Sequence, residues 1–387
     1  MTGGRIVFVY ADHAATTRLC DEALQAMLPC FQEVYGNPSS PHSAGRQAKQ
    51  KLEQARTAVA ECLGCDSREV IFTSGGSESD NQAILTAAAL GEECGRKHIV
   101  STAFEHHAVL NTLKKLESQG FSVTYLPVDP KTHNIGAEQV KHALRPDTCL
   151  VSTMYANNEI GSILPVEEIG RICREAGVLF HTDGVQAAGQ IPVNVQQAQI
   201  DFFSLSGHKF GGPKGIGALY VRKGIQLRKL LEGGGQERGK RPGTENLPAI
   251  CGMAAALGKA SSNLEETGKR VSALRDRLIA GLSEIPGSYL NGDPVHRLPG
   301  NVNFSFENIE GEILLVLLDS KGICGSSGSA CSSGSLEPSH VLLAAGRSAE
   351  LSRGSLRLSL SGSNTEEEVD YILKVVPEVV ENLRKGF

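Results

Sequence analysis

Short apolar runs alternate with amphipathic helical patterns over the first two thirds of the chain, and this alternation constrains the fold more than any other feature. Seven runs have the length and composition of strands: Val70–Thr73, His98–Ser101, Ser122–Leu126, Leu150–Tyr155, Val178–Thr182, Phe202–Leu205 and Ile216–Val221. Helical patterns lie between several of them, at Ser77–Leu90, His107–Ser118 and Val166–Ala176. Strands that alternate with helices in this way predict a mostly parallel sheet covered by helices, which places the chain in the α/β class.

The last third of the chain has a different pattern. A long helical pattern over Leu247–Ile285, interrupted near Ser261–Glu265, leads into a mixed segment. There we expect the strands Asn301–Phe306 and Ser355–Leu360 and the helices Gly311–Lys321 and Thr365–Lys385. We therefore predict two domains, a large one over residues 1–255 and a smaller α+β domain over residues 256–387. Residues 1–15 are expected to pack with the smaller domain.

Composition argues against several classes of function. The 387 residues are 40% hydrophobic and 21% charged, which is ordinary for a globular protein, and the net charge of −5 provides no basic field for nucleic acid. No apolar stretch reaches the ~18 residues of a membrane span, and Met1–Tyr10 lacks the features of a signal peptide. We expect a cytoplasmic protein whose ten cysteines are mostly reduced. The lone Cys62-x-x-Cys65 pair predicts no metal site.

One lysine lies among glycines directly after a predicted strand. The sequence Ser206-Gly207-His208-Lys209 precedes the run Phe-Gly-Gly-Pro-Lys-Gly-Ile-Gly. Glycines let the backbone approach a ligand closely, and a lysine whose pKa is lowered there can form a Schiff base with a carbonyl cofactor. For this motif taken alone, a glycine-rich turn that carries a surface lysine is the simpler explanation.

An aspartate follows another predicted strand. Asp183 comes directly after Val178–Thr182, and open α/β sheets bind ligands beyond the carboxyl ends of their strands. Pyridoxal 5′-phosphate (PLP) needs a carboxylate against its pyridine nitrogen to keep the ring protonated. One crossover and one further strand fit between Asp183 and Lys209, so both side chains can reach one ring. A helix N-cap is the alternative role for Asp183.

A glycine-rich turn joins the strand Val70–Thr73 to the next helix. Gly75, Gly76 and Ser77 lie at the start of that helix, where free N–H groups and the helix dipole attract a phosphate. The hydroxyl of Ser77 adds a donor. The turn matches neither a P-loop nor the dinucleotide-binding fingerprint, and an ordinary capped turn is the alternative.

A single cysteine lies in a segment of small residues. Cys331 is flanked by serines and glycines over Gly325–Ser335. A thiol in such a segment is expected to be accessible, and it becomes a nucleophile when a positive group lowers its pKa. A flexible linker with an incidental cysteine is the alternative.

Together these motifs resemble the NifS-like cysteine desulfurases, a group of fold-type I PLP-dependent enzymes. The resemblance extends over essentially the whole chain, and its matching stretches are Asp12–Thr17, Tyr35–Ser40, Glu105–Leu110, Ala156–Gly161, Gln236–Asn246, Gly328–Cys331, Leu336–His340 and Leu356–Leu360. It implies a large domain with a mostly parallel seven-stranded sheet and a smaller α+β C-terminal domain. His13 and Tyr155 occupy positions where relatives have other residues.

The resemblance also implies a role for each matching residue. Lys209 would bind PLP covalently and later move protons, and His106 would stack on the ring and take part in acid–base steps. Cys331 would attack the substrate sulfur, and Arg357 would bind the substrate carboxylate. Further cofactor contacts would come from Gly76, Ser77, Asn157, Asp183, Gln186, Ser206 and His208. Asn157 would also lie near the substrate, and Thr244 would reach the phosphate of the partner subunit's cofactor in a homodimer.

The implied reaction removes sulfur from L-cysteine, releases L-alanine and forms a persulfide on Cys331. The implied acceptor is an iron–sulfur scaffold or another sulfur-acceptor protein, and Cys331 is also considered as a transient iron–sulfur ligand. Two alternatives stay open, a selenocysteine lyase and a catalytically silent scaffold for sulfur transfer. The intact residues Lys209, Asp183, His106 and Arg357 argue against a silent scaffold. A same-fold aminotransferase would have no need for Cys331.

Overall fold

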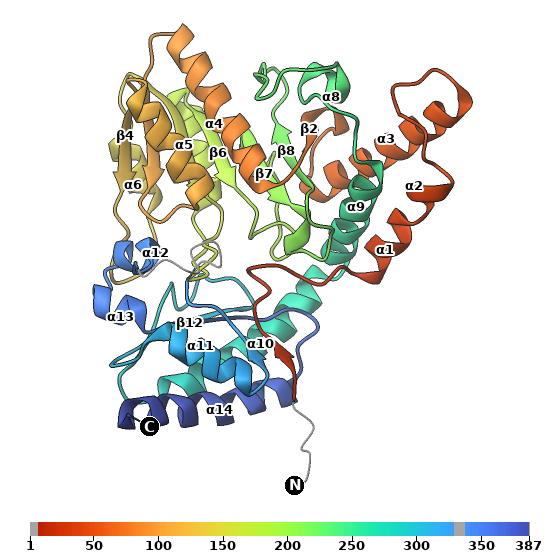
Figure 1. Ribbon diagram of the computed structural model, residues 1–387. Coiled ribbons are helices and arrows are strands. Elements are labelled where there is room, and N and C mark those ends of the chain that lie inside the picture. Colours follow the sequence, from red (N-terminus) through yellow and green to blue (C-terminus); the bar gives the residue numbers. More distant parts are fainter. Residues whose placement is uncertain (1–6, 329–336, 387) are drawn as a thin grey trace.

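A seven-stranded sheet forms the centre of the large unit in the computed structural model, which describes residues 7–328 and 337–386 (Figure 1). Its strands are β2 (Val70–Thr73), β3 (His98–Thr102), β4 (Ser122–Leu126), β5 (Thr148–Met154), β6 (Leu179–Asp183), β7 (Phe202–Ser206) and β8 (Gly217–Val221). They lie in the order β2-β8-β7-β6-β5-β3-β4. Strand β8 is antiparallel to both of its neighbours, and the other pairs are parallel. The predicted mostly parallel sheet is confirmed.

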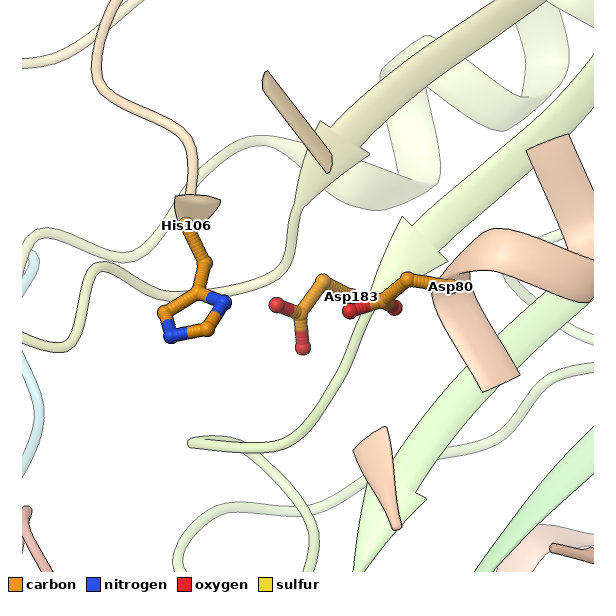
Figure 2. A group of neighbouring side chains, drawn as sticks. All are labelled: Asp80, His106 and Asp183. Carbon is orange, nitrogen blue, oxygen red and sulfur yellow. The ribbon is translucent and has the colours of Figure 1, made fainter. Parts of the chain in front are cut away.

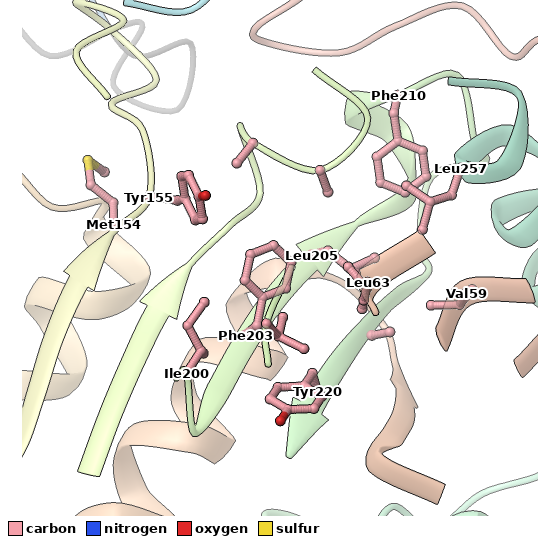
Figure 3. Close-up of a cluster of buried hydrophobic side chains, with 14 of the residues drawn as sticks. Val59, Leu63, Met154, Tyr155, Ile200, Phe203, Leu205, Phe210, Tyr220 and Leu257 are labelled. Carbon is pink, nitrogen blue, oxygen red and sulfur yellow. The ribbon is translucent and has the colours of Figure 1, made fainter. Parts of the chain in front are cut away.

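Helices cover both faces of this sheet. On one face lie α4 (Gly76–Glu93) and α5 (His107–Ser118), and on the other lie α3 (Ser43–Leu63), α6 (Ala137–Ala143), α7 (Val166–Ala176) and α9 (Leu247–Ser262). Side chains alternate along β7, so Phe202 packs with the first group and Phe203 with the second. Figure 3 shows Phe203 and Tyr220 in the second core, which also receives Leu257 of α9.

The smaller unit is built on a three-stranded antiparallel sheet. Strand β10 (Asn301–Phe306) lies between β9 (Ser288–Leu290) and β12 (Ser355–Ser359), and α10 (Leu264–Ser283), α11 (Gly311–Ser320) and α14 (Glu366–Lys385) surround the sheet. The N-terminal strand β1 (Val9–Tyr10) pairs with β11 (Ile323–Cys324) here, and Val9 and Ala11 are buried in the same core. Thr365 and Glu368 form a capping box at the start of α14.

The long helical pattern of the last third consists of two helices, α9 and α10, that meet at Asn263. The predicted domain boundary at 255/256 falls inside α9. Because Ala256 and Leu257 pack in the core of the large unit, we propose that the boundary lies at Asn263.

Several helices lie outside the predicted pattern. They are α1 (Asp21–Met27), α2 (Pro29–Gln32), α3, α6, α8 (Gln236–Gly239), α12 (His340–Ala344) and α13 (Ala349–Arg353). Within the described residues, no helix combines the length and the apolar character that crossing a membrane requires.

Candidate active site

The predicted site residues converge on one edge of the large sheet. Strands β2, β3, β5, β6 and β7 run in the same direction, so their carboxyl ends meet at this edge. A cavity of about 180 Å³ lies there. The cavity walls contain nine of the predicted residues: Gly76, Ser77, His106, Asp183, Gln186, Ser206, His208, Lys209 and Arg357. The edge is the place where open α/β sheets bind their ligands.

Two of the predicted residues that the structure describes, Asn157 and Thr244, do not line this cavity. Asn157 is fully buried, its amide donates to Phe104 O at 2.9 Å, and its Oδ1 accepts from the N–H groups of Glu159 and Ile160. It therefore fixes a turn, and its contact with the cofactor stays a prediction. Thr244 is exposed and lines a separate cavity. Cys331 lies outside the described residues.

The amine of Lys209 points toward the N-terminal segment of the chain. Its Nζ donates to the carbonyl oxygens of Ala14 at 2.6 Å and Ala15 at 2.9 Å. Gln186 Nε2 also donates to Ala14 O, at 3.0 Å. One wall of the cavity is therefore made by backbone that continues from the smaller unit. The sequence match over Asp12–Thr17 contained this wall, but residue types alone gave its carbonyl groups no role.

Asp183 ends β6 and is buried at the cavity wall. Its Oδ1 accepts a hydrogen bond from Val185 N at 2.9 Å, so the carboxylate caps the following turn and lines the cavity at once. Burial raises the pKa of Asp183, and the neighbouring carboxylate of Asp80 raises it further. A cation placed against Asp183 would favour its charged form.

Asp80 is a buried site residue that the sequence did not reveal. Figure 2 shows Asp183 between Asp80 of α4 and His106, which precedes α5, and one ligand atom from each of these residues lies within 4.8 Å of the others. His106 Nδ1 accepts from Ala108 N at 3.1 Å, so the neutral ring carries its proton on Nε2. By composition the three groups could hold a metal ion or a protonated heterocycle.

The phosphate turn, which consists of Gly75, Gly76 and Ser77 where β2 leads into α4, has the predicted form. Helix α4 begins at Gly76, and a Cβ added there would lie 2.6 Å from Val185 Cγ2, so the position requires glycine. His208 Nδ1 lies 3.1 Å from Thr16 Oγ1. Burial, with the nearby Lys209 and Lys214 charges, lowers the pKa of His208 to about 4, so this ring is neutral at neutral pH. The free N–H groups at the helix start suit an anion.

Arg357 is a buried guanidinium at the cavity wall, only 1% exposed. Its NH2 donates to Asp12 Oδ1 at 2.8 Å and its NH1 to Asn158 O at 3.0 Å. Its Nε has no hydrogen-bond partner among the described residues. Ser326, which precedes the segment containing Cys331, exchanges backbone hydrogen bonds with Arg357. These bonds hold Ser326 beside Arg357.

A larger cavity of about 480 Å³ shares Lys209 with the first. Its other walls include His13, Arg18 and Lys259, and Lys209 is the one predicted site residue that lines it. The size of a cavity therefore does not identify the site, whereas the convergence of the predicted residues does.

Comparison with known proteins places the chain in a family. A family model described as aminotransferase class-V matches residues 9–372. The chain belongs to this family. Within the class-V family it is 53% identical, over 97% of this chain and 93% of the relative, to "Cysteine desulfurase IscS" of Methanosarcina thermophila.

Solved structures of relatives have the same fold. A NifS-like protein is 41% identical with a TM-score of 0.91, over 97% of this chain and 100% of the other. The structure named "SspA in complex with cysteine" is 36% identical with a TM-score of 0.80, over 92% of this chain and 100% of the other. The fold is therefore the fold-type I architecture that the resemblance implied.

The class-V family and its cysteine desulfurases are PLP-dependent, and this chain is a PLP-dependent enzyme. The residues of the smaller cavity fit this cofactor. Asp183 offers a buried carboxylate for a protonated ring nitrogen, Lys209 offers an amine, and the start of α4 offers N–H groups for a phosphate. Asp80 Oδ1, which has no hydrogen-bond partner among the described residues, also favours a cationic ring over a neutral one.

Proposed function

We propose that the protein is a cysteine desulfurase, which removes sulfur from L-cysteine, transfers it to Cys331 and releases L-alanine. The observation that carries this proposal is the convergence of Asp183, Lys209, the phosphate turn and Arg357 on one cavity. Relatives named cysteine desulfurases support it at 53% identity, and a neighbour of the same fold is solved in complex with cysteine.

In this proposal the cofactor binds through groups that already line the cavity. Lys209 would hold PLP covalently, Asp183 would hold the ring nitrogen and Gln186 would reach the ring oxygen; all three line the cavity. The phosphate lies against Gly76, Ser77, Ser206 and His208. When bound, PLP withdraws electrons from the substrate and makes its Cα proton acidic. His106 stacks on the ring and presents the Nε2 proton that its bond to Ala108 defines.

The substrate is positioned by its carboxylate in this proposal. Arg357 binds the carboxylate in a two-pronged contact, for which NH2 exchanges its bond with Asp12. Once the substrate amine has replaced Lys209 on the cofactor, the freed Lys209 Nζ would accept the Cα proton and return a proton later. The thiolate of Cys331 then attacks the substrate sulfur, so an S–S bond forms while the C–S bond breaks. The electron pair of the broken bond stays with the substrate, which takes up protons and leaves as L-alanine.

The partners are part of the same proposal. The chain acts as a homodimer in which Thr244 reaches the phosphate of the other subunit's cofactor, consistent with the exposure of Thr244. The persulfide passes to an iron–sulfur scaffold or another acceptor protein, and Cys331 serves as a transient iron–sulfur ligand during transfer. The cytoplasm is the proposed location.

Two variants test the reaction. Cys331→Ala should keep the cofactor absorbance and lose sulfide release from L-cysteine, whereas Lys209→Ala should lose the normal absorbance band. Alanine formation is measured separately with L-cysteine and with L-selenocysteine, and sulfide release is measured with L-cysteine. Full sulfide release by Cys331→Ala would contradict the proposal, and a preference for selenocysteine would favour the lyase. A purified protein that binds no PLP would contradict the proposal.

A further inference from the structure

A second carboxylate lies beside Asp183, and the proposed function does not use it. Asp80 is one turn beyond Gly76 on α4, is 1% exposed and lines the cofactor cavity. Its Oδ1 has no hydrogen-bond partner among the described residues. A buried, unpartnered carboxylate oxygen is costly, so its position beside the cavity needs a physical explanation.

The imidazole of His181 approaches Asp80 from within the sheet. His181 is fully buried on β6, with Nδ1 2.8 Å from Ser152 Oγ and Nε2 3.2 Å from Ser204 Oγ. Nε2 also lies 3.4 Å from Asp80 Oδ1. This approach lacks the geometry of a hydrogen bond, so Asp80 Oδ1 stays without one among the described residues. Ser152 and Ser204 lie on the two strands beside β6 and fix the orientation of the ring.

The charges around the two aspartates are not balanced by their immediate neighbours. Asp80 and Asp183 face each other with His106 and His181 beside them, and the buried carboxyl of Glu105 adds no positive charge. The cations that line the cavity, Lys209 and Arg357, already contact backbone oxygens or Asp12. Two like charges at this separation destabilise each other unless a cation lies between them and the cavity.

We propose that Asp80 is a positioning residue, which forms with Asp183 a two-carboxylate site for the protonated pyridine ring of PLP and is itself oriented by His181. This inference rests on the proposed binding of the ring nitrogen to Asp183. The second carboxylate increases the negative potential at the ring nitrogen, so it strengthens cofactor binding. In the cofactor-free protein it costs stability, because it faces Asp183 without a cation.

The test is the substitution Asp80→Asn, which removes the charge and keeps the size of the side chain. Two quantities are measured at pH 8 on the full chain: the Kd of PLP by fluorescence titration, and the urea midpoint of the cofactor-free protein. We expect PLP to bind about tenfold more weakly, from the loss of one charge near the ring. The urea midpoint should stay unchanged or rise, because repulsion with Asp183 is removed. A merely structural role would lower affinity and stability together.

Glu92→Gln is the matched control, because it removes an exposed carboxylate from the same helix. It should change neither quantity. An Asp80→Asn protein with wild-type PLP affinity would overturn the inference, and so would one whose cofactor-free form is less stable or fails to fold. If wild type itself binds no PLP, or if Asp183→Asn leaves PLP affinity unchanged, the proposed function fails instead, so the two failures are distinguishable.

Discussion

At the scale of single residues, Glu105 is a carboxyl group enclosed by the protein. Its Oε1 accepts from Thr102 Oγ1 at 2.6 Å and from Met154 N at 2.9 Å, while Oε2 has no hydrogen-bond partner among the described residues. Burial raises the pKa of Glu105 to about 8. The folded protein therefore holds a proton that the unfolded chain releases, and the stability from this group falls as pH rises from about 4.5 to 8.

Glu105→Gln should remove this dependence on pH. We expect the variant to be more stable than wild type by about 2 kcal/mol at pH 8, a gain that shrinks toward pH 5. Urea unfolding at several pH values measures the difference. Glu117→Gln, on the exposed side of α5, is the control and should give parallel curves. A difference that does not vary with pH would show that Glu105 is ionised in the folded protein.

Arg357 tests substrate binding at the same scale. Arg357→Lys keeps the positive charge but loses the two-pronged contact with a carboxylate, so KM for L-cysteine should rise about tenfold. The absorbance of the bound cofactor should not change. The same substitution at exposed Arg353 is the control. An unchanged KM would remove Arg357 from the substrate site.

At the scale of elements, helix α7 packs so closely at Gly170 that a larger side chain there should destabilise the protein. A Cβ on Gly170 would lie 1.9 Å from the backbone oxygen of Ala198, which cannot move aside freely. Gly170→Ala should therefore destabilise the protein by about 3 kcal/mol. Gly258→Ala on α9 is the matched helix control, because no atom lies within 4 Å of its added Cβ, and it should stabilise by up to about 1 kcal/mol. Equal unfolding midpoints would contradict this packing.

Local patterns predicted the elements of the sheet well, because strands and crossover helices have separate periodicities. Helices α5 and α7 and strands β2, β4 and β10 have the predicted bounds, and the other predicted elements differ by one to three residues at an end. Helix α3 was not predicted, although Leu52, Val59 and Leu63 follow its buried face and Gly64 ends it in a left-handed conformation. The alternation that guided the prediction begins only at Val70, so the earlier helix had no strand beside it.

The site residues likewise differ in whether a local sequence motif reveals them or only a contact with a distant part of the chain. The positions of Asp183, Lys209 and Gly76 after strand ends were readable from the sequence, because each belongs to its own turn. Asp80 was not, because Asp183 and His181, the residues beside it, come from another element. Asn157 holds its own loop through local hydrogen bonds, and its predicted contact with the cofactor stays a prediction.

At the scale of the whole molecule, the cavity depends on both units. Asp12 and Ala14 follow β1, which belongs to the smaller unit, and they contact Arg357 and Lys209. The segment Gln236–Asn246 is anchored to the large unit by ion pairs. Glu237 in this segment forms a buried ion pair with Arg56, and Arg241 pairs with Glu78 of α4. The segment is thus held firmly while Thr244 stays exposed.

The proposed homodimer, in which each subunit would complete the other's site, can be tested at Thr244. Sedimentation should give the mass of two chains, and Thr244→Val should weaken PLP binding about tenfold without changing that mass, because a phosphate contact is lost. Thr57→Val, at an exposed position on α3, should change neither quantity. A monomer that binds PLP with full affinity would contradict the proposed role of Thr244.

Sulfur transfer to Cys331 is the central claim, and mass spectrometry tests it most directly. The protein with bound PLP is incubated with L-cysteine, digested without reductant, and the peptide containing Cys331 is weighed. We predict that this peptide gains the mass of one sulfur atom, that one L-alanine forms for each sulfur gained, and that a thiol reductant reverses the gain. An unmodified Cys331 peptide in a reaction that still produces L-alanine and sulfide would contradict the account.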